Sequence, residues 1–210
     1  MAGLALTAGV GIWGMSTLSD RFDDVQRAGD ARALALQLKF GVTDFNGWQT
    51  AYGYDNGRSR PTFLASVAAF RRTLALARAR LTRPTERRLL AEVSTAAGDF
   101  MRLDARAYKA LQAGNTAEVR RIFLGPEIAN FERTARAAQQ LAVLEDTLAG
   151  REEARFRSAR RDALRFMIGA SVIAAVLVGI LLATALELAR RAEQTLDRPV
   201  AGVAPAEPPK

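Results

Sequence analysis

The 210-residue sequence contains no cysteine and no histidine. Without cysteine the chain cannot form disulfides, thiolate nucleophiles or zinc–thiolate sites. Without histidine it has no imidazole base and no phosphohistidine relay. The remaining residues show no nucleophile–base pair and no metal-ligand spacing, so we expect no enzyme activity, no bound metal and no cofactor.

The sequence also lacks a block of charge of one sign. Its net charge is +8, from 30 Lys and Arg against 22 Asp and Glu, and its isoelectric point is near 10.8. These values invite a nucleic-acid interpretation, but acids and bases alternate along the chain and no basic block stands beside aromatic residues. Solvent-exposed helix faces explain the charged residues better than a nucleic-acid-binding surface does. We therefore expect no nucleic-acid partner.

Two long runs carry no charge at all. Residues 166–186 read FMIGASVIAAVLVGILLATAL, and about 21 helical residues at ~1.5 Å each cross the ~30 Å hydrocarbon layer of a membrane. We therefore predict a transmembrane helix there. Residues 2–18 are also uncharged but richer in glycine. No Lys or Arg precedes them, as a cleaved signal peptide would require, so we expect residues 1–18 to be an uncleaved first crossing.

Between the two crossings, residues 19–165 show helical periodicity throughout and no competing β pattern. Turn signals fall at residues 55–61, 82–85 and 113–116, and they separate four helical stretches. Four helices joined by short turns predict an all-α fold, an antiparallel up-down-up-down four-helix bundle flanked by two transmembrane helices.

The fourth helical stretch is interrupted soon after it begins. Gly125 and Pro126 follow each other there, and a proline inside a helix cannot continue the hydrogen bonding. We predict a helix kink at this pair. Beyond it, the helical pattern continues unbroken through the second crossing.

Arginines cluster on both sides of the second crossing, where they can reach lipid headgroups. Six closely precede it and three closely follow it, so the positive-inside rule argues against a cytoplasmic C-terminus. Long translocated segments weaken that rule, and it leaves the orientation open. The expected membrane-interface residues are Arg160, Arg161, Arg165, Arg190 and Arg191.

The least ordinary stretch of the first helix reads DFNGWQTAY, from Asp44 to Tyr52. In heptad terms Phe45, Trp48 and Tyr52 fall on one inward stripe. One interpretation makes the aromatic residues bundle core and the polar residues its solvated edge. The other is a ligand pocket, because Trp and Tyr offer apolar faces with polar tips while Asp and Asn receive an ammonium or hydroxyl group. The candidate ligand-binding residues are Asp44, Asn46, Trp48, Gln49 and Tyr52.

Three segments carry a recognisable pattern: GIWGMSTLS at residues 11–19, DFNGWQTAYGYD at 44–55 and LGPEIANF at 124–131. They resemble bacterial methyl-accepting chemotaxis receptors with a four-helix-bundle sensor domain, over about residues 5–199. The resemblance implies a dimeric receptor in the cytoplasmic (inner) membrane with its sensor domain outside. It also implies that residues 187–199 begin a HAMP-like linker helix, which in the family leads to a coiled coil that controls a histidine kinase.

No second HAMP helix, methylation helix or kinase-contacting hairpin follows Pro199, and residues 200–210, rich in Pro and Ala, are expected to be a disordered tail. We therefore expect the sensor and membrane portion of a chemotaxis-type receptor, which binds a small ligand or a protein and signals through the second crossing. The alternative is a regulatory or structural membrane partner that forms mixed dimers with full-length receptors. Co-purification with such a receptor favours the alternative, whereas strict self-association argues against it.

Overall fold

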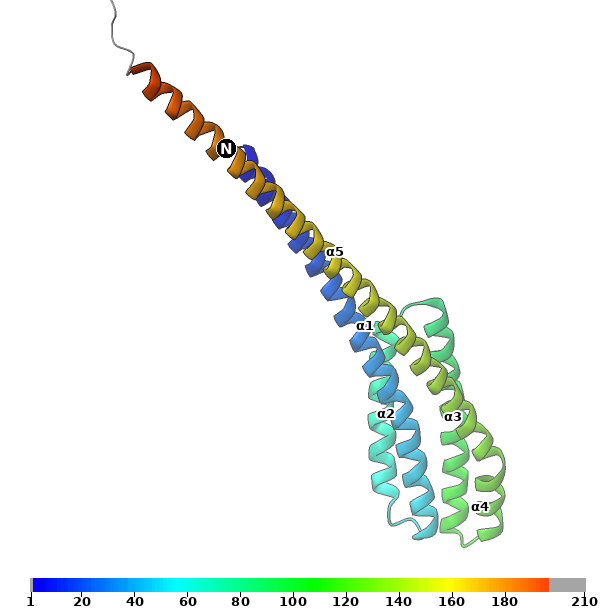
Figure 1. Ribbon diagram of the computed structural model, residues 1–210. Coiled ribbons are helices and arrows are strands. Elements are labelled where there is room, and N and C mark those ends of the chain that lie inside the picture. The colour runs from blue at the N-terminus through cyan, green and yellow to red at the C-terminus, as the bar shows by residue number, and fades with distance from the viewer. Residues whose placement is uncertain (1, 197–210) are drawn as a thin grey trace, which may run out of the picture. The chain divides into compact units, whose positions relative to one another are not determined.

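The computed structural model describes the backbone of residues 2–196 and the side chains of residues 19–191. These residues form helices and turns, with no strand among them, so the predicted all-α class is confirmed. Residues 197–199 of the predicted HAMP-like segment and the predicted tail, 200–210, lie outside the described residues. The elements, labelled in Figure 1, are α1 (Ala2–Tyr54), α2 (Arg60–Arg80), α3 (Pro84–Gln112), α4 (Thr116–Ile122), η1 (Phe123–Glu127) and α5 (Ile128–Leu196).

The chain divides into two compact units. One comprises Met1–Met15 and Ala159–Lys210, and the other is the helical domain, Ser16–Ser158.

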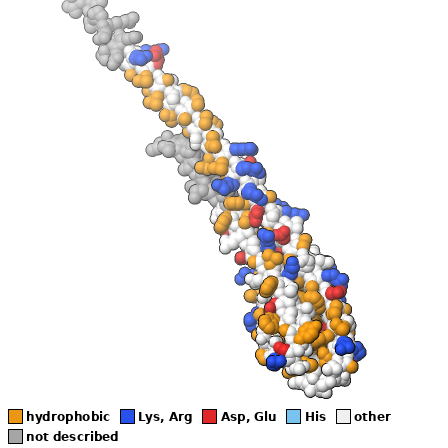
Figure 2. Space-filling model, turned by 60° about the horizontal axis from the view of Figure 1, so that its bottom comes forward, with side chains coloured by type: hydrophobic (Ala, Val, Ile, Leu, Met, Phe, Trp, Pro, Cys, Tyr) orange, Lys and Arg blue, Asp and Glu red, His pale blue; other side chains and the backbone are white. Residues whose placement is uncertain are grey.

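Among the described residues of the first unit, one helical stretch is long and apolar enough to cross a membrane. Its most apolar 18-residue window has a mean hydropathy of 2.7 and none of it is buried. Apolar side chains from Phe166 to Leu186 are exposed, and they gather on the face of this stretch in Figure 2. The predicted second crossing coincides with it. The predicted first crossing is helical from Ala2 onward, but its side chains lie outside the described residues.

The helical domain is held together by one apolar core to which α1, α2, α3 and α5 all contribute. Phe45 of α1 lies near its centre, since its ring is 5.2 Å from the ring of Phe70 in α2 and 5.2 Å from that of Phe100 in α3. Aromatic contacts of this kind bury large apolar areas and stabilise the packing of the helices. Large side chains that are fully buried include Leu38, Phe45, Tyr52, Phe63, Phe100, Ile122 and Leu141.

The turn between α1 and α2 follows its sequence closely. Asn56 and Gly57 adopt left-handed backbone conformations, with φ of 56° and 90°, which these two residue types tolerate best. Asp55 closes the turn, because its carboxylate accepts hydrogen bonds from the backbone N–H of Ser59 at 3.0 Å and from its hydroxyl at 2.6 Å. These hydrogen bonds lower the pKa of Asp55. The predicted Asn-Gly turn therefore ends α1 at Tyr54.

Regular α-helical geometry is interrupted between α4 and α5 by η1, a single π-helical turn. Gly125 has non-helical backbone angles, φ −121° and ψ −108°, and Pro126 follows it inside the turn. Proline has no N–H to donate, so the regular hydrogen-bonding pattern cannot pass through this point. On its other side, the carbonyl of Pro126 accepts a hydrogen bond from the side chain of Asn130 at 3.0 Å. The break lies at the two residues predicted to kink the helix.

Candidate functional site

A buried polar cluster joins α1, α2 and α3 at the end of the domain that carries the turn after α1. Asp104 of α3 accepts a hydrogen bond from the hydroxyl of Tyr52. Arg60 of α2 donates to both carboxylate oxygens of Asp104 at 2.7 Å. The guanidinium of Arg60 also lies 4.4 Å from the ring centroid of Tyr108 and 4.8 Å from those of Tyr52 and Phe63. Three helices are thus tied by one charged pair enclosed by aromatic rings.

Burial governs the protonation of this cluster. It raises the pKa of Asp104, although the hydrogen bonds from Tyr52 and Arg60 and the charge of Arg60 act to lower it. Burial, followed by the charge of Asp104, also raises the pKa of Tyr52 far above its ordinary value. Tyr52 therefore remains a neutral hydroxyl that donates a hydrogen bond to Asp104.

Glu127, at the end of η1, is the second buried acid at this end of the domain. Its side chain is 2% exposed, and neither carboxyl oxygen has a hydrogen-bond partner among the described residues. Burial, followed by the charge of Asp104, raises the pKa of Glu127 to about 8, while Gln49 and Arg60 act to lower it. The carboxyl of Glu127 is accordingly mostly protonated at neutral pH.

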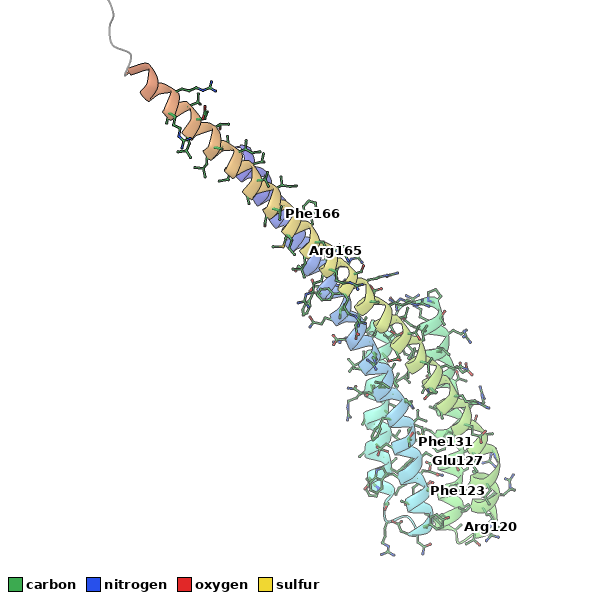
Figure 3. The ribbon with its side chains drawn as sticks, viewed as in Figure 1. Arg120, Phe123, Glu127, Phe131, Arg165 and Phe166 are labelled. Carbon is green, nitrogen blue, oxygen red and sulfur yellow. The ribbon has the colours of Figure 1, made fainter. Side chains whose placement is uncertain are left out.

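Glu127 lines a cavity of about 750 Å³, which is within the size range of small-molecule sites. Its walls come from α1, α3, α4, η1 and α5, all within the helical domain. Figure 3 labels four of the lining residues, Arg120, Phe123, Glu127 and Phe131. The apolar walls include Phe100, Leu111, Val119, Phe123, Ile128 and Phe131, and the polar ones include Asn46, Gln49, Thr50, Arg120 and Glu132.

No family model matches this chain, and no curated protein or solved structure matches it. The comparisons therefore do not identify a chemotaxis receptor. Within the part of the chain that the structure describes, no group of three His, Cys, Asp or Glu side chains is placed to hold a metal ion.

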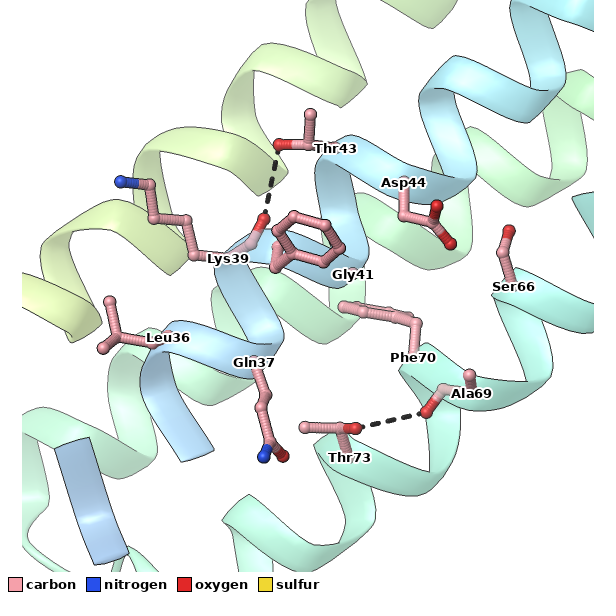
Figure 4. A pocket seen from close by; sticks show the side chains of 11 residues that line it. Leu36, Gln37, Lys39, Gly41, Thr43, Asp44, Ser66, Ala69, Phe70 and Thr73 are labelled. Atoms are coloured by element: carbon pink, nitrogen blue, oxygen red, sulfur yellow. Dashed lines mark hydrogen bonds between the residues drawn. The ribbon is translucent and has the colours of Figure 1, made fainter. Parts of the chain in front are cut away.

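The five candidate ligand residues do not come together in one place. Asn46 and Gln49 line the 750 Å³ cavity, whereas Tyr52 is fully buried in the polar cluster. Asp44 lies in a separate groove of about 640 Å³, lined by α1 and α2 and shown in Figure 4. Trp48 is 39% exposed and lines neither of these two spaces. The polar residues of α1 therefore lie in different environments and do not form one binding site.

The predicted inward position of Trp48 is wrong, and Gln49 takes that place. At about 100° per residue, Gln49 lies about 40° around the helix from Phe45, on the side of Leu38 and Val42. Trp48 lies about 60° from Phe45 on the opposite side. The heptad step of three residues placed Trp48 on the stripe, but the straight 3.6-residue helix buries the residue four positions after Phe45, so Gln49 is only 4% exposed.

Asp104, Arg60 and Glu127 were not identified as site residues from the sequence. The position of Asp104 in the sequence nevertheless indicates its role. It lies about 40° around α3 from Phe100, in the middle of the apolar stripe that includes Val93 and Ala97. A charged residue at a core position indicates a buried partner of opposite charge. Arg60 and Glu127 left no comparable signal, because each stands beside a proline at a helix boundary.

Gly53 brings α1 close to the cavity wall formed by Phe123. A Cβ atom at Gly53 would lie 2.6 Å from Cε2 of that ring, whereas a Cβ at Gly47, six residues earlier, meets nothing within 4 Å. We expect Gly53→Ala to lower the free energy of unfolding by about 1–3 kcal/mol, since the ring must move. Gly47→Ala, the matched control, should raise it by about 0.5–1 kcal/mol through helix propensity. Urea unfolding followed by circular dichroism measures both; equal effects of the two variants would contradict the close contact.

A second pair of buried acids lies elsewhere in the domain. Glu86 of α3 and Glu145 of α5 are 2% and 1% exposed. Arg83 contacts both, with its Nη1 atom 3.0 Å from a carboxylate oxygen of Glu86 and 3.9 Å from one of Glu145. Burial, followed by the charge of Glu86, raises the pKa of Glu145. One arginine thus faces two buried acids, and burial favours the protonated form of Glu145.

The five arginines expected at the membrane interface are all exposed. Arg165 directly precedes Phe166, where the apolar stretch of α5 begins (Figure 3). Beyond that stretch, Arg191 pairs with Glu187, with 3.3 Å between Nε and Oε1. Their place at a lipid interface stays a prediction.

Proposed function

We propose that this chain is the sensor and membrane portion of a chemotaxis-type transmembrane receptor. In this proposal residues 19–165 form an extracytoplasmic, antiparallel up-down-up-down bundle, and residues 1–18 and 166–186 cross the cytoplasmic membrane. The bundle binds a small molecule or a protein, and the second crossing carries the resulting change to a HAMP-like helix that begins at residue 187.

The observation that supports this proposal most is the continuity of α5. Two residues at its start, Ile128 and Phe131, line the 750 Å³ cavity, and the same uninterrupted helix contains the candidate membrane span. A ligand that touches the start of a continuous helix can shift or rotate it, because packed helices move as rigid bodies. The π-helical turn η1 directly before α5 gives the helix a point about which such a movement can start.

A partner chain on α1 belongs to the same proposal. Leu36 and Phe40 are 45% and 74% exposed on the helical domain, and both line the groove shown in Figure 4. An exposed apolar patch of this kind is typical of protein interfaces. We propose that it packs against a second copy of this chain or against a full-length receptor.

The absence of native cysteine makes the proposed topology directly testable. We expect a cysteine placed at Arg58, an exposed residue in the turn after α1, to react with a membrane-impermeant maleimide in intact cells. A cysteine at Val203, beyond the second crossing, should react only after lysis. Reaction of the Val203 variant alone in intact cells would reverse the proposed orientation, and equal reaction of both variants would argue against a membrane crossing between them.

The signalling step is tested with a chimera in which residues 1–199 replace the corresponding part of a chemotaxis receptor. Replacing Pro126 with alanine removes the break at η1, so we expect it to change the basal kinase activity of the chimera by about twofold or more. Pro61→Ala, in the first turn of α2, is the control and should leave that activity unchanged. An unchanged kinase activity of the chimera in the Pro126→Ala variant would contradict the proposal that the signal passes through η1 and α5.

A further inference from the structure

We infer that the 750 Å³ cavity beside Glu127 binds a small organic cation, a primary amine with an apolar body, and that Glu127 is its counter-ion. The inference deepens the proposed receptor function and rests on it for the signalling role of the ligand. The binding itself is argued from the chemistry of the cavity.

Two unpartnered oxygens mark this cavity as a site for hydrogen-bond donors. Oε1 and Oε2 of Glu127 are buried, and neither has a hydrogen-bond partner among the described residues. Buried polar atoms in folded proteins are nearly always paired, since an unpaired one costs about 1–3 kcal/mol. An ammonium group, which has donors only, satisfies both oxygens of Glu127.

The charges around Glu127 favour a ligand with one positive charge. Asp104 on α3 raises the pKa of Glu127, and Arg60 on α2 acts to lower it. Arg60 is already bound to Asp104 by two contacts of 2.7 Å, so these two charges offset each other. On α1, Tyr52 is neutral because burial raises its pKa. Glu127 is therefore left without a cation of its own.

Two further charged residues line the cavity from the helices on either side of η1. Arg120 on α4 and Glu132 on α5 are both exposed, so solvent screens their opposite charges. The electrostatic field on a ligand beside Glu127 is set by Glu127 and the Arg60–Asp104 pair. This field disfavours the binding of an anion. A carboxylate ligand would meet two buried acids.

The remaining walls fit an organic body better than a metal ion. Phe100, Phe123 and Phe131 present aromatic surface to the cavity, and aromatic rings attract organic cations as well as apolar groups. A hard cation such as Mg²⁺ or Ca²⁺ requires six or more oxygen ligands. A quaternary ammonium has no N–H group and would leave the oxygens of Glu127 unpaired, which is why we assign a primary amine.

Calorimetric titration of the purified full-length chain in detergent with 2-phenylethylamine tests the inference. We expect saturable binding of one amine per chain and the release of close to one proton at neutral pH, since the amine ionises a carboxyl whose pKa is about 8. Affinity should be about 20-fold lower at about pH 6.5 than at about pH 8.5. Proton release is read from titrations in buffers of different ionisation enthalpy, and it needs no variant.

Two matched comparisons make the result specific. Glu127→Gln keeps the shape of the side chain but removes the charge, and it should weaken binding about tenfold or more and abolish proton release. Glu153→Gln, an exposed acid outside the cavity, should leave the affinity unchanged. The anion 3-phenylpropionate, similar in size but opposite in charge, should not bind.

Three results would overturn the inference: no amine binding up to about 10 mM, binding without proton release, or tighter binding of 3-phenylpropionate. Thermal melting of Glu127→Gln shows whether that variant is folded. The receptor proposal is judged separately by the cysteine labelling and the chimera. If the chain binds the amine but Pro126→Ala leaves the kinase activity of the chimera unchanged, the binding site is supported and the signalling proposal is contradicted. If Pro126→Ala changes that activity but the chain binds no amine, only the binding site is contradicted.

Discussion

Replacing Asp104 with alanine is expected to lower the free energy of unfolding by about 3–5 kcal/mol. The change removes the only ionic partner shown for Arg60 among the described residues and the acceptor of the Tyr52 hydroxyl. The Arg60 side chain is 14% exposed, so its charge would stay largely desolvated and unpaired. Urea unfolding of the purified chain in detergent, followed by circular dichroism, measures the loss.

The control for this variant is another ion pair between helices. Arg32 of α1 and Asp146 of α5 lie 2.7 Å apart, but their side chains are 47% and 59% exposed. Because water solvates both charges, Asp146→Ala should cost less than about 1 kcal/mol. Similar losses for Asp104→Ala and Asp146→Ala would show that the buried cluster contributes no more than a surface pair.

Raising the pH from about 5 to about 9 is expected to destabilise the folded chain by several kcal/mol. Folded Glu127 keeps its proton up to about pH 8, whereas the ordinary pKa is 4.5. Between these values the folded state binds more protons than the unfolded state, so the free energy of unfolding falls by up to about 1.4 kcal/mol per pH unit for this group. Burial raises the pKa of Glu145 and Asp104 as well, and both add to the same trend.

Glu127→Gln isolates the contribution of Glu127 to this pH dependence. Glutamine resembles the protonated acid, so the variant should lose less stability with rising pH and exceed the unmodified chain in stability above about pH 8. Glu153→Gln removes an exposed carboxyl and should leave the pH profile unchanged. Melting temperatures between about pH 5 and pH 9 give both profiles, and identical profiles for Glu127→Gln and the unmodified chain would refute the raised pKa.

Local features of the fold could be predicted because their causes are local. The Asn-Gly turn after Tyr54 depends on two residues that tolerate left-handed conformations, and the break at Gly125 depends on the missing N–H of Pro126. The candidate span in α5 depends on the composition of one continuous segment. None of these features requires knowledge of which helix lies beside which.

Burial was harder to predict, as α1 shows. The apolar pattern placed Phe45 and Tyr52 inside, which the structure confirms. It also placed Trp48 inside, which is wrong, because Trp48 and Gln49 both flank the stripe and the choice between them depends on where α2, α3 and α5 pack around α1. The structure buries the smaller polar residue and exposes the larger aromatic one.

The sequence by itself predicted the all-α class, the turns, the kink and two membrane crossings, of which the one at residues 166–186 coincides with the candidate span among the described residues. Only the tertiary structure decided that Asp104 pairs with Arg60, 44 residues away, and that Glu127 is buried beside a cavity without a hydrogen-bond partner. Secondary structure follows from interactions between residues close in the chain. The protonation of an acid follows from the charges and the solvent around it, and the residues that shift the pKa of Glu127 come from three other helices, α1, α2 and α3.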